Sequence, residues 1–188
     1  MFIQTEDTPN PATQKFIPGR LVMEAGTANF PNPDAAKQTP LARNLFAING
    51  VTGVFFGSDF VSITKSAETE WFTIKPLILE SLTTYFMTHE KVKVKVQLSE
   101  SVDSSTTSSS DDNDIAAEIR ELIESRVRPA VAQDGGDIIF DRFENGVVYL
   151  TMQGACSGCP SSSATLKSGI ENMLRYYIPE VTEVRATE

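Results

Sequence analysis

The two cysteines of this 188-residue chain, Cys156 and Cys159, lie in one short phrase, Gly-Ala-Cys-Ser-Gly-Cys-Pro. A closed zinc site or an iron-sulfur cluster usually needs four Cys or His ligands. The chain has a single histidine, His89, far upstream, so one chain offers at most three soft ligands. Two copies facing each other across a two-fold axis would supply four thiolates, because such an interface repeats the same patch on both subunits. The ligand count therefore predicts a site shared within a homodimer.

Three chemical roles and one inert role compete for this cysteine pair. It could hold an iron-sulfur cluster between subunits, act as a dithiol-disulfide redox couple, or form half of a structural zinc site. The inert alternative is a local disulfide or a turn. A thioredoxin-like redox fold would need strands and helices on both sides of the motif within about 100 residues, and the surrounding segment is shorter. Spacing alone leaves all four roles open.

Residues 115–188 are predicted to form a small α+β module around the cysteines, in the order helix, strand, strand, helix, strand. Asp114 is a candidate N-cap for the first helix, Pro129 should bend its last turns, and the glycines of Asp-Gly-Gly-Asp (134–137) are interpreted as its C-cap and turn. The remaining elements are strands at 138–143 and 147–153 joined at Asn145-Gly146, a helix capped by the serines at 161–163 and stopped by Pro179, and a strand at 181–185.

This order places both sulfurs in a loop just ahead of a helix N-terminus. Free N–H groups and the positive end of the helix dipole favour thiolate over thiol there, and thiolate is the metal-binding form. We expect both cysteines to lie in an exposed loop, so that replacing them removes few packing contacts.

Residues 1–98 are predicted to form a second α+β module, and the segment 99–114 a disordered linker. That segment contains five acids, no bases and one large apolar residue, Val102, so it cannot bury enough apolar surface to order itself. The expected elements of the first module are strands at 2–6 and 16–24, a helix at 40–48, a hairpin of strands 51–56 and 60–64, a helix over 71–85 and an edge strand over 92–96. Trp71 is interpreted as a core residue and His89 as a helix-end residue.

Charge and composition exclude several classes of partner. The net charge of −9 and the pI near 4.7 argue against nucleic-acid binding, which needs clustered Lys and Arg. No window approaches the roughly 18 apolar residues of a membrane span, and acids stand where a signal peptide carries bases. Two close cysteines fit a reducing compartment. No catalytic triad, recognisable carboxylate pair or phosphate loop is present, so no enzyme activity is predicted.

Two stretches of the chain resemble a known family. The run Val-Arg-Pro-Ala-Val-Ala-Gln-Asp-Gly-Gly-Asp-Ile from Val127, the hairpin, and the phrase around Cys156 with the helix after it resemble the Nfu family, in the module that corresponds to the C-terminal domain of NifU. The beginning, Phe-Ile-Gln-Thr-Glu-Asp-Thr-Pro-Asn-Pro from Phe2, is similar to the N-terminal domain of the mitochondrial and alpha-proteobacterial type of Nfu protein.

The resemblance implies an iron-sulfur cluster scaffold or carrier rather than an enzyme. It places the ligands of a 4Fe-4S cluster at Cys156 and Cys159, with each chain holding half of the cluster in a homodimer; a 2Fe-2S form is a further possibility. The implied partners are an upstream scaffold as donor and apo iron-sulfur proteins as recipients. The implied location is the bacterial cytoplasm, or the mitochondrial matrix for a processed chain.

Overall fold

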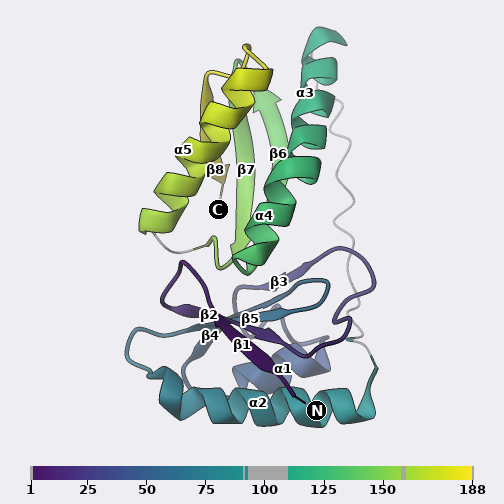
Figure 1. The fold of residues 1–188 in the computed structure, drawn as a ribbon, viewed down its shortest axis with the longest axis vertical. Coiled ribbons are helices and arrows are strands. Elements are labelled where there is room, and N and C mark those ends of the chain that lie inside the picture. Colours follow the sequence, from purple (N-terminus) through teal and green to yellow (C-terminus); the bar gives the residue numbers. More distant parts are fainter. Residues whose placement is uncertain (1, 91, 93–109, 158–159, 188) are drawn as a thin grey trace. The chain divides into compact units, whose positions relative to one another are not determined.

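The structure, a computed structural model, describes residues 2–90, 92, 110–157 and 160–187. The chain divides into two compact units, Met1–Gln97 and Leu98–Glu188, and each combines helices with a sheet (Figure 1). The two-unit α+β class predicted from the sequence is therefore confirmed. Of the predicted linker, residues 99–109 lie outside the described part of the chain. Among the described residues, no helix has the length and apolar character needed to cross a membrane.

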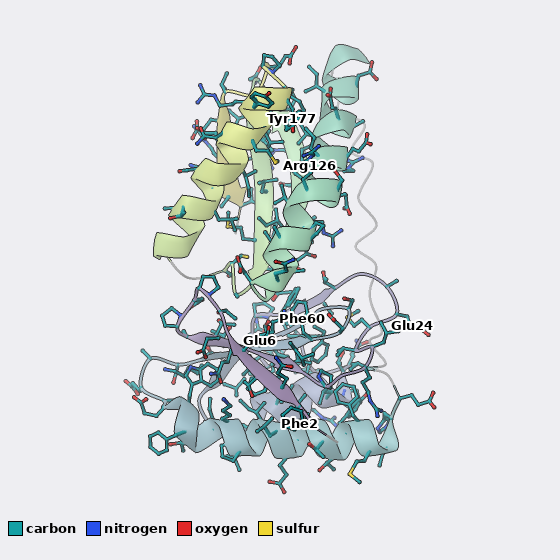
Figure 2. All side chains as sticks on the ribbon, in the orientation of Figure 1. Phe2, Glu6, Glu24, Phe60, Arg126 and Tyr177 are labelled. Carbon is teal, nitrogen blue, oxygen red and sulfur yellow. The ribbon has the colours of Figure 1, made fainter. Side chains whose placement is uncertain are left out.

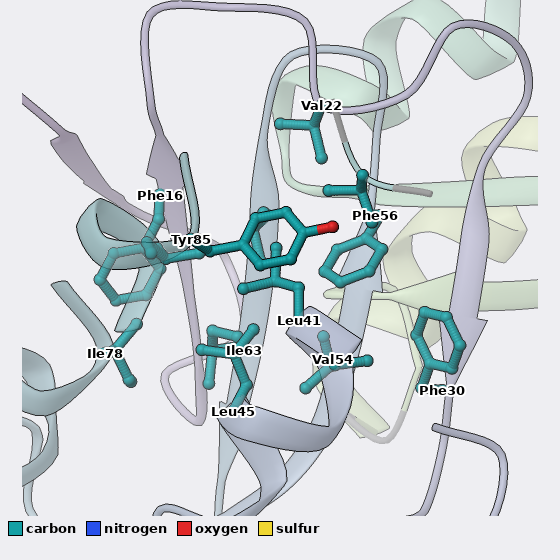
Figure 3. Packing of buried hydrophobic residues seen from close by; sticks show 14 of the residues in the cluster. Phe16, Val22, Phe30, Leu41, Leu45, Val54, Phe56, Ile63, Ile78 and Tyr85 are labelled. Atoms are coloured by element: carbon teal, nitrogen blue, oxygen red, sulfur yellow. The ribbon is translucent and has the colours of Figure 1, made fainter. Parts of the chain in front are cut away.

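Unit 1 packs two helices against one face of a five-stranded antiparallel sheet (Figure 1). The sheet order is β1-β2-β5-β4-β3, and Figure 3 shows strand residues such as Phe16 and Phe56 meeting Leu41 of the first helix and Ile78 and Tyr85 of the second. The elements are β1 (Gln4–Asp7), β2 (Thr13–Ile17), β3 (Ala28–Phe30), α1 (Pro40–Phe46), β4 (Val51–Phe56), β5 (Val61–Lys65) and α2 (Trp71–Thr88).

Two strands of unit 1 differ from the sequence prediction, and a third predicted strand is only partly described. The strand predicted over 16–24 stops at Ile17, because Pro18 and Gly19 follow and Gly19 has a φ of 70° that leaves the extended region. The three-residue strand β3 was not predicted, since three residues are too few to show alternation. Of the expected edge strand, Val92 is buried and donates its N–H to the Val22 carbonyl at 3.0 Å, and residues 93–96 lie outside the described residues.

The prediction for His89 is confirmed, and the prediction for Trp71 is confirmed in part, because this residue lies at the edge of the core. His89 caps the C-terminal end of α2, is exposed, and stacks its ring on Tyr85 with the centroids 4.4 Å apart. Trp71 packs half-buried against the unit 1 core, and its indole N–H donates to the Pro11 carbonyl at 3.1 Å.

Unit 2 packs its helices on one face of a three-stranded sheet of order β6-β7-β8 (Figure 1). The β6–β7 pair is antiparallel and β7–β8 is parallel, with α5 as the crossover between them. Strand residues Ile138, Val148 and Leu150 share the core with Ile123 and Leu174 from the helices. The elements are α3 (Ser110–Leu122), the π-helical turn η1 (Ile123–Val127), α4 (Arg128–Gln133), β6 (Gly136–Glu144), β7 (Val147–Gly154), α5 (Pro160–Tyr177) and β8 (Glu183–Thr187).

The helices of unit 2 begin earlier than the sequence predicts. The first helix starts at Ser110, so residues 110–114 of the predicted linker are helical and Asp114 is not an N-cap. Residues 161–163 lie inside α5 and not ahead of it, because the helix starts at Pro160, whose fixed φ suits the first helical position. Pro129 is the second residue of α4, directly after the π-helical turn η1, so the helical hydrogen-bond pattern changes next to the position where a bend is predicted.

The end of α5 also differs from its predicted apolar face. Tyr177 follows Ile170 by seven residues, a helical spacing that predicts the same buried face, but Tyr177 is 42% exposed and the Arg126 guanidinium lies over its ring at 5.0 Å (Figure 2). A partly exposed aromatic ring gains from a cation over its face. The aromatic residue therefore covers the outside of the η1 turn and does not fill the core.

Candidate functional site

Strand pairing turns the chain inward just before the first cysteine. Gly154, the last residue of β7, pairs with Gly136, the first residue of β6, and has a φ of 63° that only glycine adopts easily. The next residue, Ala155, donates its N–H to the Gly135 carbonyl at 3.2 Å. These contacts bring Cys156 back over the start of β6.

Cys156 is buried in the core of unit 2. Its side chain is 5% exposed and belongs to the same hydrophobic cluster as Ile138 and Leu150. The expectation that this cysteine lies in an exposed loop is therefore wrong, because the turn at Gly154 directs it towards the sheet and not towards solvent. Cys159 lies outside the described residues, so the prediction for its position stays a prediction.

Gly136 is a site residue that the sequence reasoning missed. The two glycines before the strand were both assigned to the helix C-cap and turn, and Gly135, with a φ of 79°, has that role. Gly136 instead begins β6, and a Cβ added there would overlap the Cys156 sulfur and come within 2.8 Å of the Gln153 carbonyl oxygen. A glycine in a strand often marks such a close approach, which was the available signal.

Burial also controls the protonation of Cys156. Desolvation is the largest cause of a raised pKa at this thiol, and the nearby carboxylates of Asp134 and Asp137 add to it because they oppose another negative charge. Together they raise the pKa of Cys156 to about 12. The prediction that Cys156 is a thiolate is therefore wrong for this conformation, in which the neutral thiol is favoured. The helix dipole favours thiolate, but α5 begins only at Pro160, four residues later, and the dipole's effect is confined to the first turn.

A buried ion pair holds the start of strand β6 in place beside Cys156. The Asp137 side chain is 4% exposed and accepts two hydrogen bonds from Arg128, Nε to Oδ1 at 2.8 Å and Nη2 to Oδ2 at 2.7 Å. Oδ1 also accepts the N–H of Ile138 at 2.8 Å. Arg128 donates to Glu124 as well, and these carboxylates raise the pKa of its guanidinium, Asp137 most of all. The pair thereby ties the strand to α4.

The described part of the chain offers one thiol and no complete metal site. Among the described residues, no group of three His, Cys, Asp or Glu side chains could hold a metal ion. The described residues offer one soft sulfur ligand, Cys156, from a strand-loop-helix connection, and a closed four-ligand shell needs further ligands.

The raised pKa of Cys156 predicts an unusual pH dependence for its alkylation. In the Cys159→Ser variant, the rate with iodoacetamide should keep rising between about pH 9 and pH 10.5, where an ordinary thiol of pKa near 8.5 levels off. Because the folded pKa lies above the unfolded one, the stability that burial of the neutral thiol contributes is complete below about pH 8.5 and is lost as the pH rises towards 12. A profile that levels off near pH 9 would contradict the burial seen here.

Comparison with protein families gives two matches that divide as the units do. Residues 3–89 match the model of the N-terminal domain of the scaffold protein Nfu/NifU, and residues 119–185 match the NifU-like domain. The second match contains both cysteines.

Curated relatives are similar over nearly all of this chain, which spans about two thirds of their length. It is 50% identical over 186 residues to NifU-like protein 4, mitochondrial, of Arabidopsis thaliana, covering 98% of this chain and 65% of the relative. It is 48% identical over 185 residues to the human NFU1 iron-sulfur cluster scaffold homolog, mitochondrial, covering 98% and 71%. A solution structure of a NifU-like protein from Saccharomyces cerevisiae matches with 27% identity and a TM-score of 0.47, over 50% of this chain and 86% of that one.

Proposed function

Because the chain belongs to the Nfu family of NifU-like scaffold proteins, we propose that it carries a 4Fe-4S cluster between two copies of itself and delivers it to apo-proteins. The observation that carries the proposal is the NifU-like match over 119–185, which contains the only two cysteines of the chain. Cys156 and Cys159 from each of two chains would supply the four thiolates that such a cluster needs.

Shared ligation supports delivery. Each chain makes only two of the bonds to the cluster, so an incoming apo-protein can replace one chain's thiolates by ligand exchange without opening an enclosed cage. The protein then acts as a carrier, and no enzymatic step is needed. A 2Fe-2S form is a smaller cargo that the same four sulfurs could hold.

Partners and location follow from the family. The recipients are apo iron-sulfur proteins and the donor is an upstream scaffold. The two relatives above are named as mitochondrial proteins, which favours the mitochondrial matrix over the bacterial cytoplasm as the place of action. Unit 1 is proposed to recognise donors or recipients, because a tethered module raises the local concentration of its partner around the cluster site.

The burial of Cys156 weighs against the redox alternative. Disulfide oxidoreductases use an exposed cysteine of low pKa, and Cys156 has a raised pKa and 5% exposure. The Cys159→Ser variant, which would trap a mixed disulfide in a redox protein, should trap none. A structural zinc ion could use the same four thiolates, so metal content must decide between zinc and iron.

Anaerobic reconstitution of the full chain with iron and sulfide tests the proposal. We expect about four iron and four sulfide ions for every two chains, with the visible and Mössbauer spectra of a 4Fe-4S cluster, and activation of an apo iron-sulfur enzyme on mixing. The Cys159→Ser variant, treated in the same way, is the control and should stay colourless. Wild-type protein that remains colourless, or that is isolated anaerobically with zinc in place of iron, would contradict the proposal.

A further inference from the structure

The sulfur of Cys156 sits in a recess formed by the start of β6. On one side it lies where a Cβ of Gly136 would be, so only the absence of a side chain there makes room for it. The Gln153 carbonyl and the backbone of Cys156 itself lie close to the same point, at 2.8 Å and 3.0 Å from the position of that Cβ. The remainder of the side chain packs in the core of unit 2.

This recess has no space for a cluster. A metal ion bound to Cys156 must lie about 2.3 Å from the sulfur, as in other metal-thiolate sites, and the rest of the cluster lies beyond it. A side chain that is 5% exposed presents almost none of its surface to such a group. The position of the sulfur in this structure is therefore incompatible with the ligand role proposed above.

The wall of the recess is firmly anchored. Gly135 accepts the N–H of Ala155 at 3.2 Å and donates its own N–H to the Ala132 carbonyl at 3.1 Å. Asp137, on the other side of Gly136, is fixed by its two hydrogen bonds to Arg128 and by the N–H of Ile138. Because Gly136 is held between two anchored neighbours, the sulfur leaves the recess by a movement of Cys156 itself and not of this wall.

We propose that Gly136 and Asp137 are positioning residues that store the Cys156 sulfur in a closed recess while the chain carries no cluster, and that Cys156 must move out of this recess to bind iron. The inference rests on the proposed function only for the identity of the ligand. The closed state keeps the thiol away from solvent oxidants and stray metal ions. Loading then includes a local opening step, of the kind that ordinarily precedes exposure of a buried group.

Thiol accessibility tests the recess without any cluster. In the full-length Cys159→Ser chain, Cys156 should react with iodoacetamide at neutral pH at least about tenfold more slowly when folded than when unfolded in urea. With increasing reagent, the folded rate should approach a limit set by opening. Equal rates in the folded and unfolded chain would overturn the proposal.

A pair of matched glycine variants identifies the cause of protection. Gly136→Ala in the same background places a methyl group where the sulfur lies, so the sulfur is displaced and the alkylation rate should rise about tenfold or more towards the unfolded value. Gly169→Ala is the control, because a Cβ at this helical position meets nothing within 4 Å and the rate should not change. A folded Gly136→Ala chain with wild-type protection would overturn the proposal.

Two further variants separate positioning from general loss of stability. Asp137→Asn keeps the size of the side chain and removes its charge, so it should loosen the anchor and raise the alkylation rate without Gly136 being altered. Leu174→Ala should lower the melting temperature through the core but leave Cys156 protected well below it. Equal deprotection in both would assign the effect to stability and contradict positioning. The alkylation measurements involve no cluster, so they test the recess independently of the carrier function. If Cys156 is protected but the chain fails to bind a cluster on reconstitution, the carrier function is refuted and the recess is not.

Discussion

Replacing either cysteine by alanine is expected to abolish cluster binding completely. With Cys156→Ala or Cys159→Ala, two chains bring only two thiolates, which is half of what a 4Fe-4S cluster needs. After anaerobic reconstitution, we expect no visible iron-sulfur absorbance and no iron above background after desalting. A variant that retains its cluster with wild-type stoichiometry would show that the missing ligand is supplied elsewhere.

The fold of the Cys156→Ala chain should survive at a small cost. Because Cys156 is a buried core residue, its replacement removes one sulfur from the packed interior of unit 2 and should cost about 1–2 kcal/mol of unfolding free energy. Urea denaturation measures this loss. A chain that fails to fold would show that the thiol has a larger structural role than its packing indicates.

Among substitutions of partly exposed residues in unit 2, we expect replacement of Arg128 by methionine to lower the free energy of unfolding most. The substitution removes both hydrogen bonds that Arg128 donates to the Asp137 carboxylate, which is 4% exposed. Breaking a buried pair from one side costs about 3–5 kcal/mol, and because the Arg128 side chain is itself 28% exposed we expect about 2–3 kcal/mol. The measurement is the urea midpoint of the unit 2 transition.

Arg175→Met is the matched control for this prediction. Arg175 forms an exposed pair with Glu171 at 3.5 Å on α5, and a pair of this kind is worth about 0.5 kcal/mol or less. If both variants lose the same stability, the buried pair has no special contribution. A loss confined to Arg128→Met would show that the anchored start of β6 is a major source of stability in unit 2.

Local sequence signals predicted most elements of unit 2. Asn145 and Gly146 both adopt positive φ, 51° and 80°, as the two-residue hairpin turn between β6 and β7 requires, and this chemistry is visible in the sequence. Helical spacing identified α5 because Ile170 and Leu174 are buried on one face. Helix starts were less accurate, since Ser161 and its neighbours can serve as a cap or as helix residues and Pro160 decides between them.

The state of the candidate ligand could not be predicted, because it depends on contacts between distant residues. The sequence places Cys156 between a strand and a helix N-terminus, which predicts an exposed loop and a thiolate. In the structure, Gly136 lies 20 residues earlier in the chain and makes the recess into which the thiol turns. Burial then outweighs the helix dipole, whose effect is confined to the first turn of α5. Only the three-dimensional pairing of β6 with β7 brings these residues together.

The native mass of the reconstituted chain, recorded anaerobically and without added thiols such as glutathione, tests the shared cluster most directly. We predict a species of two chains with a single 4Fe-4S cluster, which separates into cluster-free chains of 20.6 kDa when the cluster is removed by a chelator. A single chain that carries a complete cluster under these conditions would contradict the account, because its two cysteines cannot fill four coordination positions.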